Sequence, residues 1–198
     1  IKNKNLKSKI NKKLKIKENF DTNGVKSIYG LSKLASEDLI KEINYSNNIN
    51  YIINRFGVIS GPWQFGKQDQ GFMSLWMGKH MNKKKLSFIG FGGYGNQVRD
   101  VIHIDDVCEI ILKQIIGFRK IKNITFNIGG GLKNSVSLKE LTDLCQKISG
   151  NKVPIKRVNK TSNYDIPYFV TDNSKIYHFY KWKPTRDINS ILSPGDKN

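Results

Sequence analysis

An amphipathic helix followed directly by a β-branched run is the feature of this sequence that most limits its fold. From Ser27, the stretch SIYGLSKLASEDLIKEI repeats apolar residues at helical spacing, with charged residues between them. The next run, NINYIINRFGVISGP, is rich in β-branched and aromatic residues and ends in Gly61-Pro62, which predicts a buried strand leading into a loop. A helix followed by such a strand is half of a βαβ repeat, so the sequence predicts an α/β fold. The apolar side of the predicted helix carries Leu31, Leu34, Ala35, Leu39 and Ile43.

Helical and extended patterns continue to alternate after the glycine cluster at 90–95. We expect a helix over 72–81, a strand over 86–90, a helix with Asp105 as its N-cap, a strand over 124–128 and a final helix near 188–192. The inner face of the helix after Asp105 is predicted to hold Val107, Ile110, Ile111 and Ile115. Ser137 and Glu140 form a capping box that opens a further helix, and Gly150 is its expected stop. Its inward side chains are predicted to be Leu138, Leu141, Cys145 and Ile148.

Composition indicates a globular protein of 198 residues, 38% of them hydrophobic. The sequence has no run of roughly 18 to 20 apolar residues and no apolar leader segment, so we expect a cytoplasmic protein that does not cross a membrane. The net charge is +18. Residues 1–18 carry much of this excess in a low-complexity basic arm that we expect to be poorly ordered, and the remaining lysines are spread along the chain. Lysines that are spread along the chain in this way favour a solvated surface over a nucleic-acid interface.

The cysteine and histidine positions predict neither a disulfide nor a metal site. Cys108 and Cys145 each lie among apolar residues at helical spacing, which is typical of reduced core thiols. No Cys/His cluster or HExxH spacing accompanies them. We therefore expect no bound metal.

Tyr29 and Lys33 lie four residues apart on the predicted helix, so their side chains share one face. A phenol is a poor base at neutral pH, but an adjacent ammonium group stabilises the phenolate. The lysine can also donate a hydrogen bond to a bound ribose. By spacing alone, an exposed aromatic residue beside a surface lysine would explain the pair equally well.

The longer segment SIYGLSKLASE resembles the catalytic helix YGxSKxxxE of extended short-chain dehydrogenases, in the family of NAD-dependent nucleotide-sugar epimerases and dehydratases. This resemblance implies that Tyr29 and Lys33 are catalytic and also contact NAD. A second segment, NQVRDVIHIDD, resembles the family's V-R-D-x-x-H-V-x-D motif and implies that Arg99 clamps the substrate diphosphate. The alternatives are an Arg99 ion pair with Asp100 and, for His103, a packing role, which we favour for the histidine.

A third segment, NRFGVISGPWQFGKQDQGF, resembles the family's strand beneath the nicotinamide and the loop that lines the sugar pocket. The resemblance implies cofactor contacts from Phe56, Gly57 and Val58. It also implies substrate contacts, which are assigned to Gln64, Asp69 and Gln70. The segment is most similar to that of cytidine-diphosphate-sugar 2-epimerases of the paratose/tyvelose type. An Asn-Pro pair found in many related 4-epimerases is replaced here by Val58-Ile59.

The resemblance covers residues 19–193 and implies the C-terminal part of a Rossmann-type fold with a small substrate-binding lobe. The Gly129-Gly130-Gly131 triplet does not open a helix directly, so it does not fit a dinucleotide-binding turn. The family's GxxGxxG turn and the Ser or Thr of its catalytic set do not occur before Tyr29. We therefore expect the N-terminal dinucleotide-binding half to be missing from this chain, and encoded separately if the enzyme is split.

The predicted organisation has three parts. Residues 1–18 form the basic arm, 19–61 end the Rossmann-type domain, and 62–198 are mainly substrate-binding lobe, with 100–131 returning to the Rossmann-type part. The implied reaction is epimerisation of a nucleoside-diphosphate sugar, CDP-linked by best match, through transient oxidation to a keto-sugar. The alternatives are a 4-epimerase, a 4,6-dehydratase or a non-catalytic nucleotide-sugar-binding remnant. Homo-oligomerisation through the Tyr29 helix is a further expectation from the resemblance.

Overall fold

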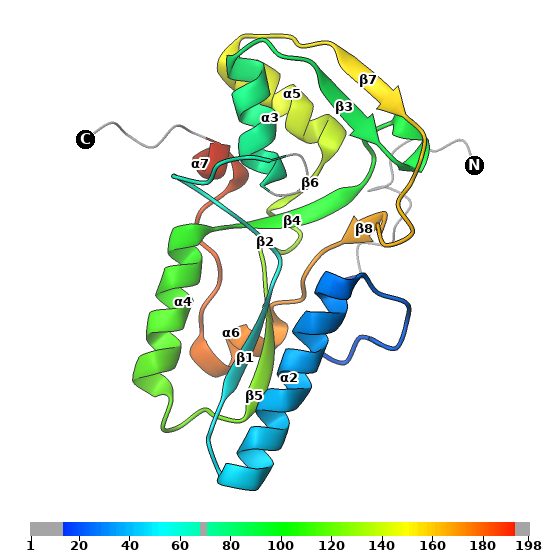
Figure 1. Cartoon of the computed structure of the whole chain (residues 1–198). Coiled ribbons are helices and arrows are strands. Elements are labelled where there is room, and N and C mark those ends of the chain that lie inside the picture. Colours follow the sequence, from blue (N-terminus) through cyan, green and yellow to red (C-terminus); the bar gives the residue numbers. More distant parts are fainter. Residues whose placement is uncertain (1–13, 68–70, 193–198) are drawn as a thin grey trace.

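The computed structural model describes residues 14–67 and 71–192, which form a mixed α/β chain with a lower body and an upper lobe (Figure 1). The lower body contains α2 (Ile28–Asn47), β1 (Ile52–Phe56), α4 (Ile104–Gly117), β5 (Ile124–Ile128) and α6 (Ser174–Tyr180). The upper lobe contains α3 (Phe72–Met81), β3 (Leu86–Ile89), the 3-10 helix η1 (Phe91–Gly93), α5 (Leu138–Ser149), β7 (Ile155–Val158) and α7 (Ile188–Leu192). Between them lie β2 (Val58–Ser60), β4 (Val98–His103), β6 (Ser135–Ser137) and β8 (Tyr168–Phe169).

The predicted strand within 48–62 is divided into two strands at Gly57. β1 pairs in parallel with β5, whereas β2 pairs in parallel with β4. A Cβ on Gly57 would lie only 3.0 Å from the Asp100 Oδ1 atom and 3.4 Å from the Gly129 Cα atom. Glycine fits best here, because a Cβ would press on these neighbours where the chain changes sheets.

The lower body is built on the parallel β1–β5 pair, whose register runs from Ile52 opposite Ile124 to Phe56 opposite Ile128. A buried apolar cluster packs around it; its members are Ile102, Val107, Ile110, Phe126, Ile128, Ile176 and Trp182. The prediction for the inner face of α4 is confirmed for Val107 and Ile110, which are buried, and is wrong for Ile111 and Ile115, which are exposed. The predicted N-cap is also wrong: His103 caps α4, and its Nδ1 atom accepts a hydrogen bond from the backbone N–H of Asp105.

The upper lobe encloses a second apolar cluster, which includes Met73, Trp76, Leu86, Phe88, Val101, Leu141 and Cys145. The capping box of Ser137 and Glu140 is confirmed, and Gly150 ends α5 in the left-handed conformation. Ile148, in contrast, is partly exposed at 39%. The prediction for the cysteines holds for Cys145 and is wrong for Cys108, which is exposed on α4.

The helix α2 is the least embedded element of the lower body, since none of its residues is buried. Residues 1–13 of the basic arm lie outside the described residues, but its last residues make specific contacts. Ile16 forms a parallel bridge with Thr171, and the Glu18 carboxylate accepts a hydrogen bond from the backbone N–H of Asn127. The expectation of a poorly ordered arm is therefore wrong for residues 14–18.

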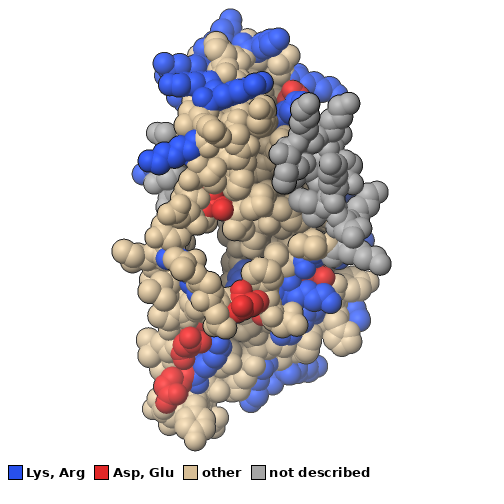
Figure 2. Space-filling model, turned by 90° about the vertical axis from the view of Figure 1, so that its right-hand side faces the viewer, with Lys and Arg blue, Asp and Glu red and all other residues tan. Residues whose placement is uncertain are grey.

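Lysine and arginine side chains gather over the upper lobe and recur below it, with few acidic groups on the same face (Figure 2). Over the ranges that the structure describes, no helix combines the length and the apolar character required to span a bilayer.

Candidate functional site

The N-terminal end of α2 presents Tyr29 and Lys33 side by side. The Ser27 hydroxyl caps the helix by accepting a hydrogen bond from Gly30 N at 3.1 Å. The Lys33 Nζ atom lies 5.3 Å from the centroid of the Tyr29 ring, and 70% of Tyr29 is exposed. Among the described residues, neither the Tyr29 hydroxyl nor the Lys33 ammonium hydrogen-bonds to a protein group. Both groups are thus open to a ligand, and their chemistry fits ribose and sugar hydroxyls.

An ion pair fastens α2 to β1. The Arg55 guanidinium donates to both Glu37 carboxylate oxygens, at 2.8 and 2.7 Å, and also to the Glu18 carbonyl at 3.1 Å. The hydrogen bond to Glu37 is the main cause that raises the pKa of Arg55. Glu37 lies four residues beyond Lys33 on the helix, so Glu37, Lys33 and Tyr29 lie on the same side of α2. The sequence interpretation included Glu37 only as a motif letter and missed Arg55 as its partner.

The predicted cofactor-contacting residues Phe56, Gly57 and Val58 lie at the junction of β1 and β2. Phe56 packs against the lower apolar cluster and Val58 against the upper one. Their side chains therefore serve mainly packing, which leaves their backbone, with Gly57 between them, as the part that could face a ligand.

The loop after β2 uses Gln64 internally. The Gln64 amide oxygen accepts hydrogen bonds from the hydroxyls of Ser60 and Ser74, at 2.9 and 3.1 Å, and its nitrogen donates to the Ile59 carbonyl. These bonds assign Gln64 to loop stability in this structure. The other two predicted substrate residues, Asp69 and Gln70, lie outside the described residues.

Arg99 lies on β4, and its ion-pair partner is Asp165. The Arg99 Nη2 atom is 2.6 Å from Asp165 Oδ1, and Nη1 donates to the Val98 carbonyl at 2.8 Å. Burial lowers the pKa of Arg99, against the opposing effect of Asp165. Asp100, the partner in the alternative structural interpretation of Arg99, forms no ion pair with it among the described residues. No sequence signal pointed to Asp165, which is 66 residues away along the chain. Among the described contacts, none joins Arg99 directly to Tyr29 or Lys33.

Asp100 is instead a fully buried acceptor that ties three segments together. Its Oδ2 atom accepts hydrogen bonds from the backbone N–H groups of Gly131 and Thr171, at 3.0 and 3.1 Å. Desolvation raises the pKa of the Asp100 carboxyl. The glycine triplet that begins at Gly129 thus leads from β5 toward β6 and does not open a helix, as the sequence predicted.

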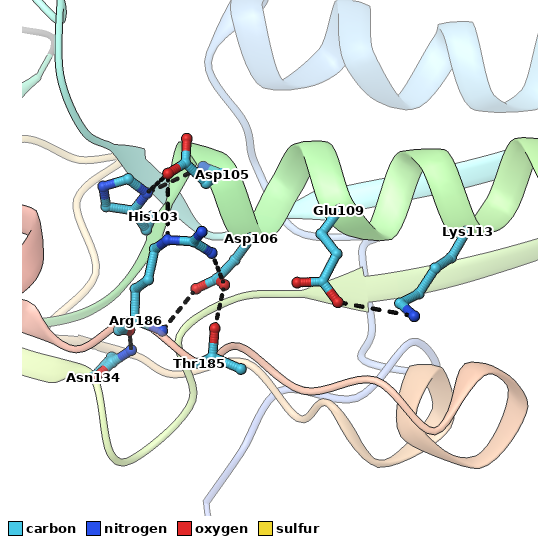
Figure 3. Close-up of polar contacts among 8 residues, drawn as sticks. All are labelled: His103, Asp105, Asp106, Glu109, Lys113, Asn134, Thr185 and Arg186. Atoms are coloured by element: carbon cyan, nitrogen blue, oxygen red, sulfur yellow. Dashed lines mark hydrogen bonds and ion pairs between the residues drawn. The ribbon is translucent and has the colours of Figure 1, made fainter.

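A second polar network joins α4 to the segment before α7 (Figure 3). Asp106 is fully buried and accepts hydrogen bonds from the Thr185 hydroxyl and from both the backbone and the side chain of Arg186. Arg186 Nε also lies 3.3 Å from Asp105 Oδ2. His103 is buried beside this network as a cap, which agrees with the predicted packing role. In the described ranges, no three His, Cys, Asp or Glu side chains are grouped to hold a metal ion.

Comparison with known proteins identifies the family of this chain. Residues 11–129 match the model of the NAD dependent epimerase/dehydratase family. The chain is 30% identical over 160 residues to the CDP-paratose 2-epimerase of Salmonella typhi, covering 80% of this chain and 47% of that protein. It is 37% identical over 131 residues to a putative UDP-glucose 4-epimerase of Methanocaldococcus jannaschii, covering 66% of this chain and 40% of that protein. The chain thus spans about half the length of the curated relatives that it matches.

Solved structures show the same fold. The UDP-glucose 4-epimerase of Thermus thermophilus in complex with NAD superposes with a TM-score of 0.78 at 17% identity, covering 92% of this chain and 58% of that one. A variant of the UDP-glucuronic acid 4-epimerase of Bacillus cereus, in complex with a fluorinated UDP-sugar and NAD, gives a TM-score of 0.78 at 24% identity. That match covers 90% of this chain and 54% of the other. The chain therefore adopts part of the fold of these longer enzymes.

Proposed function

The chain belongs to the NAD dependent epimerase/dehydratase family, and we propose that it acts in NAD-dependent epimerisation of a nucleoside-diphosphate sugar. The observation that carries this proposal is the paired placement of Tyr29 and Lys33 at one end of α2, where both are exposed and, among the described residues, make no side-chain hydrogen bond to protein. Phenol and ammonium groups in this arrangement suit proton transfer with a sugar hydroxyl.

In the proposed mechanism, Tyr29 takes the proton from the hydroxyl of the sugar carbon that is oxidised, and later returns it. Lys33 holds a ribose hydroxyl and stabilises the negative charge on the Tyr29 oxygen. NAD, when bound, supplies a nicotinamide that can accept a hydride and give it back. The keto-sugar turns over between the two transfers, so the sugar is inverted at one carbon and no net oxidation occurs.

Arg99 is the proposed anchor for the diphosphate while the sugar turns. A half-buried guanidinium forms strong, charge-assisted hydrogen bonds to phosphoryl oxygens. Arg99→Ala should weaken binding of the nucleoside-diphosphate sugar by about 1.5 to 3 kcal/mol. Calorimetric titration measures this loss, and Arg119→Ala, which removes an exposed arginine near the end of α4, is the matched control. Equal effects of the two changes would remove Arg99 from the proposed site.

We propose a CDP-linked sugar, with 2-epimerisation, as the first substrate class to test, because the match to CDP-paratose 2-epimerase covers 80% of the chain. UDP-sugar 4-epimerisation is the second candidate, supported by the higher identity, 37%, to a putative UDP-glucose 4-epimerase over a shorter stretch. Parallel assays of CDP-paratose, UDP-glucose and UDP-glucuronic acid distinguish these. Conversion of a UDP-sugar alone would reject the CDP assignment and keep the reaction.

We further propose that turnover needs the dinucleotide-binding half that the longer relatives contain. The 198-residue chain has no GxxGxxG turn to hold a pyrophosphate. By itself it should neither bind NAD measurably nor epimerise a sugar, and a matching N-terminal half supplied in trans should restore both. NAD binding by the purified chain alone, in a calorimetric titration, would contradict this.

Tyr29→Phe tests the proposed base in the complemented enzyme. Loss of the phenol should slow turnover by about 10²- to 10⁴-fold, the usual contribution of general acid–base catalysis, with sugar affinity nearly unchanged. Tyr45→Phe is the control, because Tyr45 is also an exposed tyrosine of α2. A Tyr29→Phe enzyme as active as the Tyr45→Phe enzyme would refute the assignment.

A further inference from the structure

The guanidinium assigned to the diphosphate already has an anionic partner in this structure. Arg99 Nη2 and Asp165 Oδ1 are 2.6 Å apart, and the two side chains are 22% and 33% exposed. A ligand phosphate that uses the same edge of the guanidinium must therefore compete with this carboxylate. The pair is open enough to solvent for a ligand to reach it.

The two partners are anchored very differently. The backbone of Arg99 lies in β4 between two other strands, opposite Val136 of β6 and Phe169 of β8. Asp165 lies in the irregular segment 159–167 between β7 and β8, where the preceding residues 159–164 are all exposed. Apart from Arg99, the Asp165 carboxylate accepts only from the neighbouring Ile166 N–H among the described residues. The guanidinium is fixed by the sheet, whereas the carboxylate belongs to a surface turn.

Electrostatics favours an exchange of one anion for another at this position. A guanidinium half-removed from water needs a negative partner, because unpaired burial of a charge is costly. A carboxylate supplies one negative charge, whereas a diphosphate supplies more charge and more acceptor oxygens. Replacement of Asp165 by a diphosphate would keep Arg99 paired throughout.

We infer that Asp165 is an internal counter-ion of Arg99 and that a nucleoside diphosphate displaces it on binding. Asp165 therefore lowers the affinity of the site for the diphosphate. This inference rests on the proposed function, since it requires Arg99 to bind the diphosphate. The same segment reaches the glycine cluster, because the Thr161 hydroxyl accepts a hydrogen bond from Phe91 N at 2.8 Å. Displacement of Asp165 thus acts on a segment that also contacts the loop at 90–95.

The test measures CDP and UDP binding to the purified chain by calorimetry at about 0.15 M salt, where long-range charge effects are screened. Asp165→Asn removes the competing charge and should tighten binding about tenfold, the change expected for a charge-assisted contact that need not be broken. Asp143→Asn, which removes an exposed carboxylate of α5, is the control for net charge and should change binding less than about twofold. Asp165→Ala provides a second variant, and thermal melts check that each protein is folded.

Arg99→Ala separates this inference from the proposed function. In the Arg99→Ala background, Asp165→Asn should have no further effect on CDP or UDP binding. Binding that requires Arg99 but is unchanged or weakened by both Asp165 variants would overturn the counter-ion role alone. Binding that does not require Arg99, or no binding by any of the proteins, would overturn the diphosphate anchor and the counter-ion role with it.

Discussion

The buried carboxylate of Asp106 provides the sharpest stability test, because an exposed aspartate of the same helix contacts the same arginine. Asp106 is fully buried, and its Oδ1 atom accepts from the Arg186 side chain at 2.8 Å and from the Thr185 hydroxyl at 2.9 Å. Its Oδ2 atom accepts from the backbone N–H of Arg186 at 3.1 Å. Asp105 is 56% exposed and lies 3.3 Å from Arg186 Nε. We predict that Asp106→Asn destabilises the chain far more than Asp105→Asn.

The magnitude follows from these contacts. An asparagine at 106 has one oxygen in place of two, so at least one donor of Thr185 or Arg186 must face the new amide N–H₂ group. Loss of a charge-assisted bond together with an unsatisfied buried donor costs about 2 to 4 kcal/mol. The full 3 to 5 kcal/mol or so of a broken buried ion pair is not expected, since the Arg186 side chain is 37% exposed and can regain water. Asp105→Asn removes an exposed pair, worth less than about 1 kcal/mol.

Urea unfolding, followed by circular dichroism and by tryptophan fluorescence, measures both free energies of unfolding. Trp182, which is 3% exposed in the lower apolar cluster, reports on the region near this network. In a thermal melt, Asp106→Asn should lower Tm by about 4 to 16 °C, given about 2 to 4 °C per kcal/mol for a chain of this size. If the two variants lose the same free energy, the reasoning from burial and hydrogen bonding at Asp106 is refuted.

Three further predictions concern other buried or paired groups. Burial raises the pKa of Asp100 above its unfolded value, so its contribution to stability grows as the pH falls through that raised pKa. From about pH 7 to about pH 4, the wild type should therefore gain free energy of unfolding relative to Asp100→Asn. A constant difference between the two proteins would contradict the desolvation of this carboxyl. The exposed Cys108 should react with a maleimide in the native chain, whereas Cys145, whose pKa burial raises to about 12, should react only after unfolding; mass spectrometry that finds two labels on the native chain would disprove this. Arg55→Lys loses the two-point contact with the Glu37 carboxylate and should speed hydrogen exchange of the α2 amides several-fold. Lys41→Ala, which removes an exposed ion pair, is the control, and equal exchange in the two variants would rule out the Arg55–Glu37 pair as the anchor of α2.

The elements that the sequence predicted well are those with local signals. The helix over 72–81 and the capped helix that begins after Ser137 form where predicted, because apolar spacing and capping groups act within a few residues. The division at Gly57 could not be predicted this way. The β-branched run continues across it without interruption, and the crowding that separates the strands comes from Asp100 and Gly129, both distant in sequence.

The candidate site likewise contains contacts that local sequence signals predict and contacts that they do not. The contact between Tyr29 and Lys33 follows from helical geometry and was predictable from four-residue spacing. The partner of Arg99 was not, because Asp165 comes from a segment without any repeating pattern and meets Arg99 only through the pairing of β4 with β8. Gln64 carried no signal of its internal role, since an amide in a loop can bond equally well to protein or to ligand.

The two parts of the candidate site are held by different forces, and this decides how each responds to change. Arg99 extends from β4, and Val98 and Val101 of the same strand are almost fully buried, so core packing fixes the position of Arg99. The helix α2 has no buried residue, and the polar contacts that attach it include the Arg55–Glu37 pair and a weaker amide bond from Asn44 to Asn123. Ion pairs of partly exposed groups weaken with salt, whereas apolar burial does not. High ionic strength should therefore act first on the placement of α2 with Tyr29 and Lys33, and cavity-forming substitutions in the core should act first on Arg99.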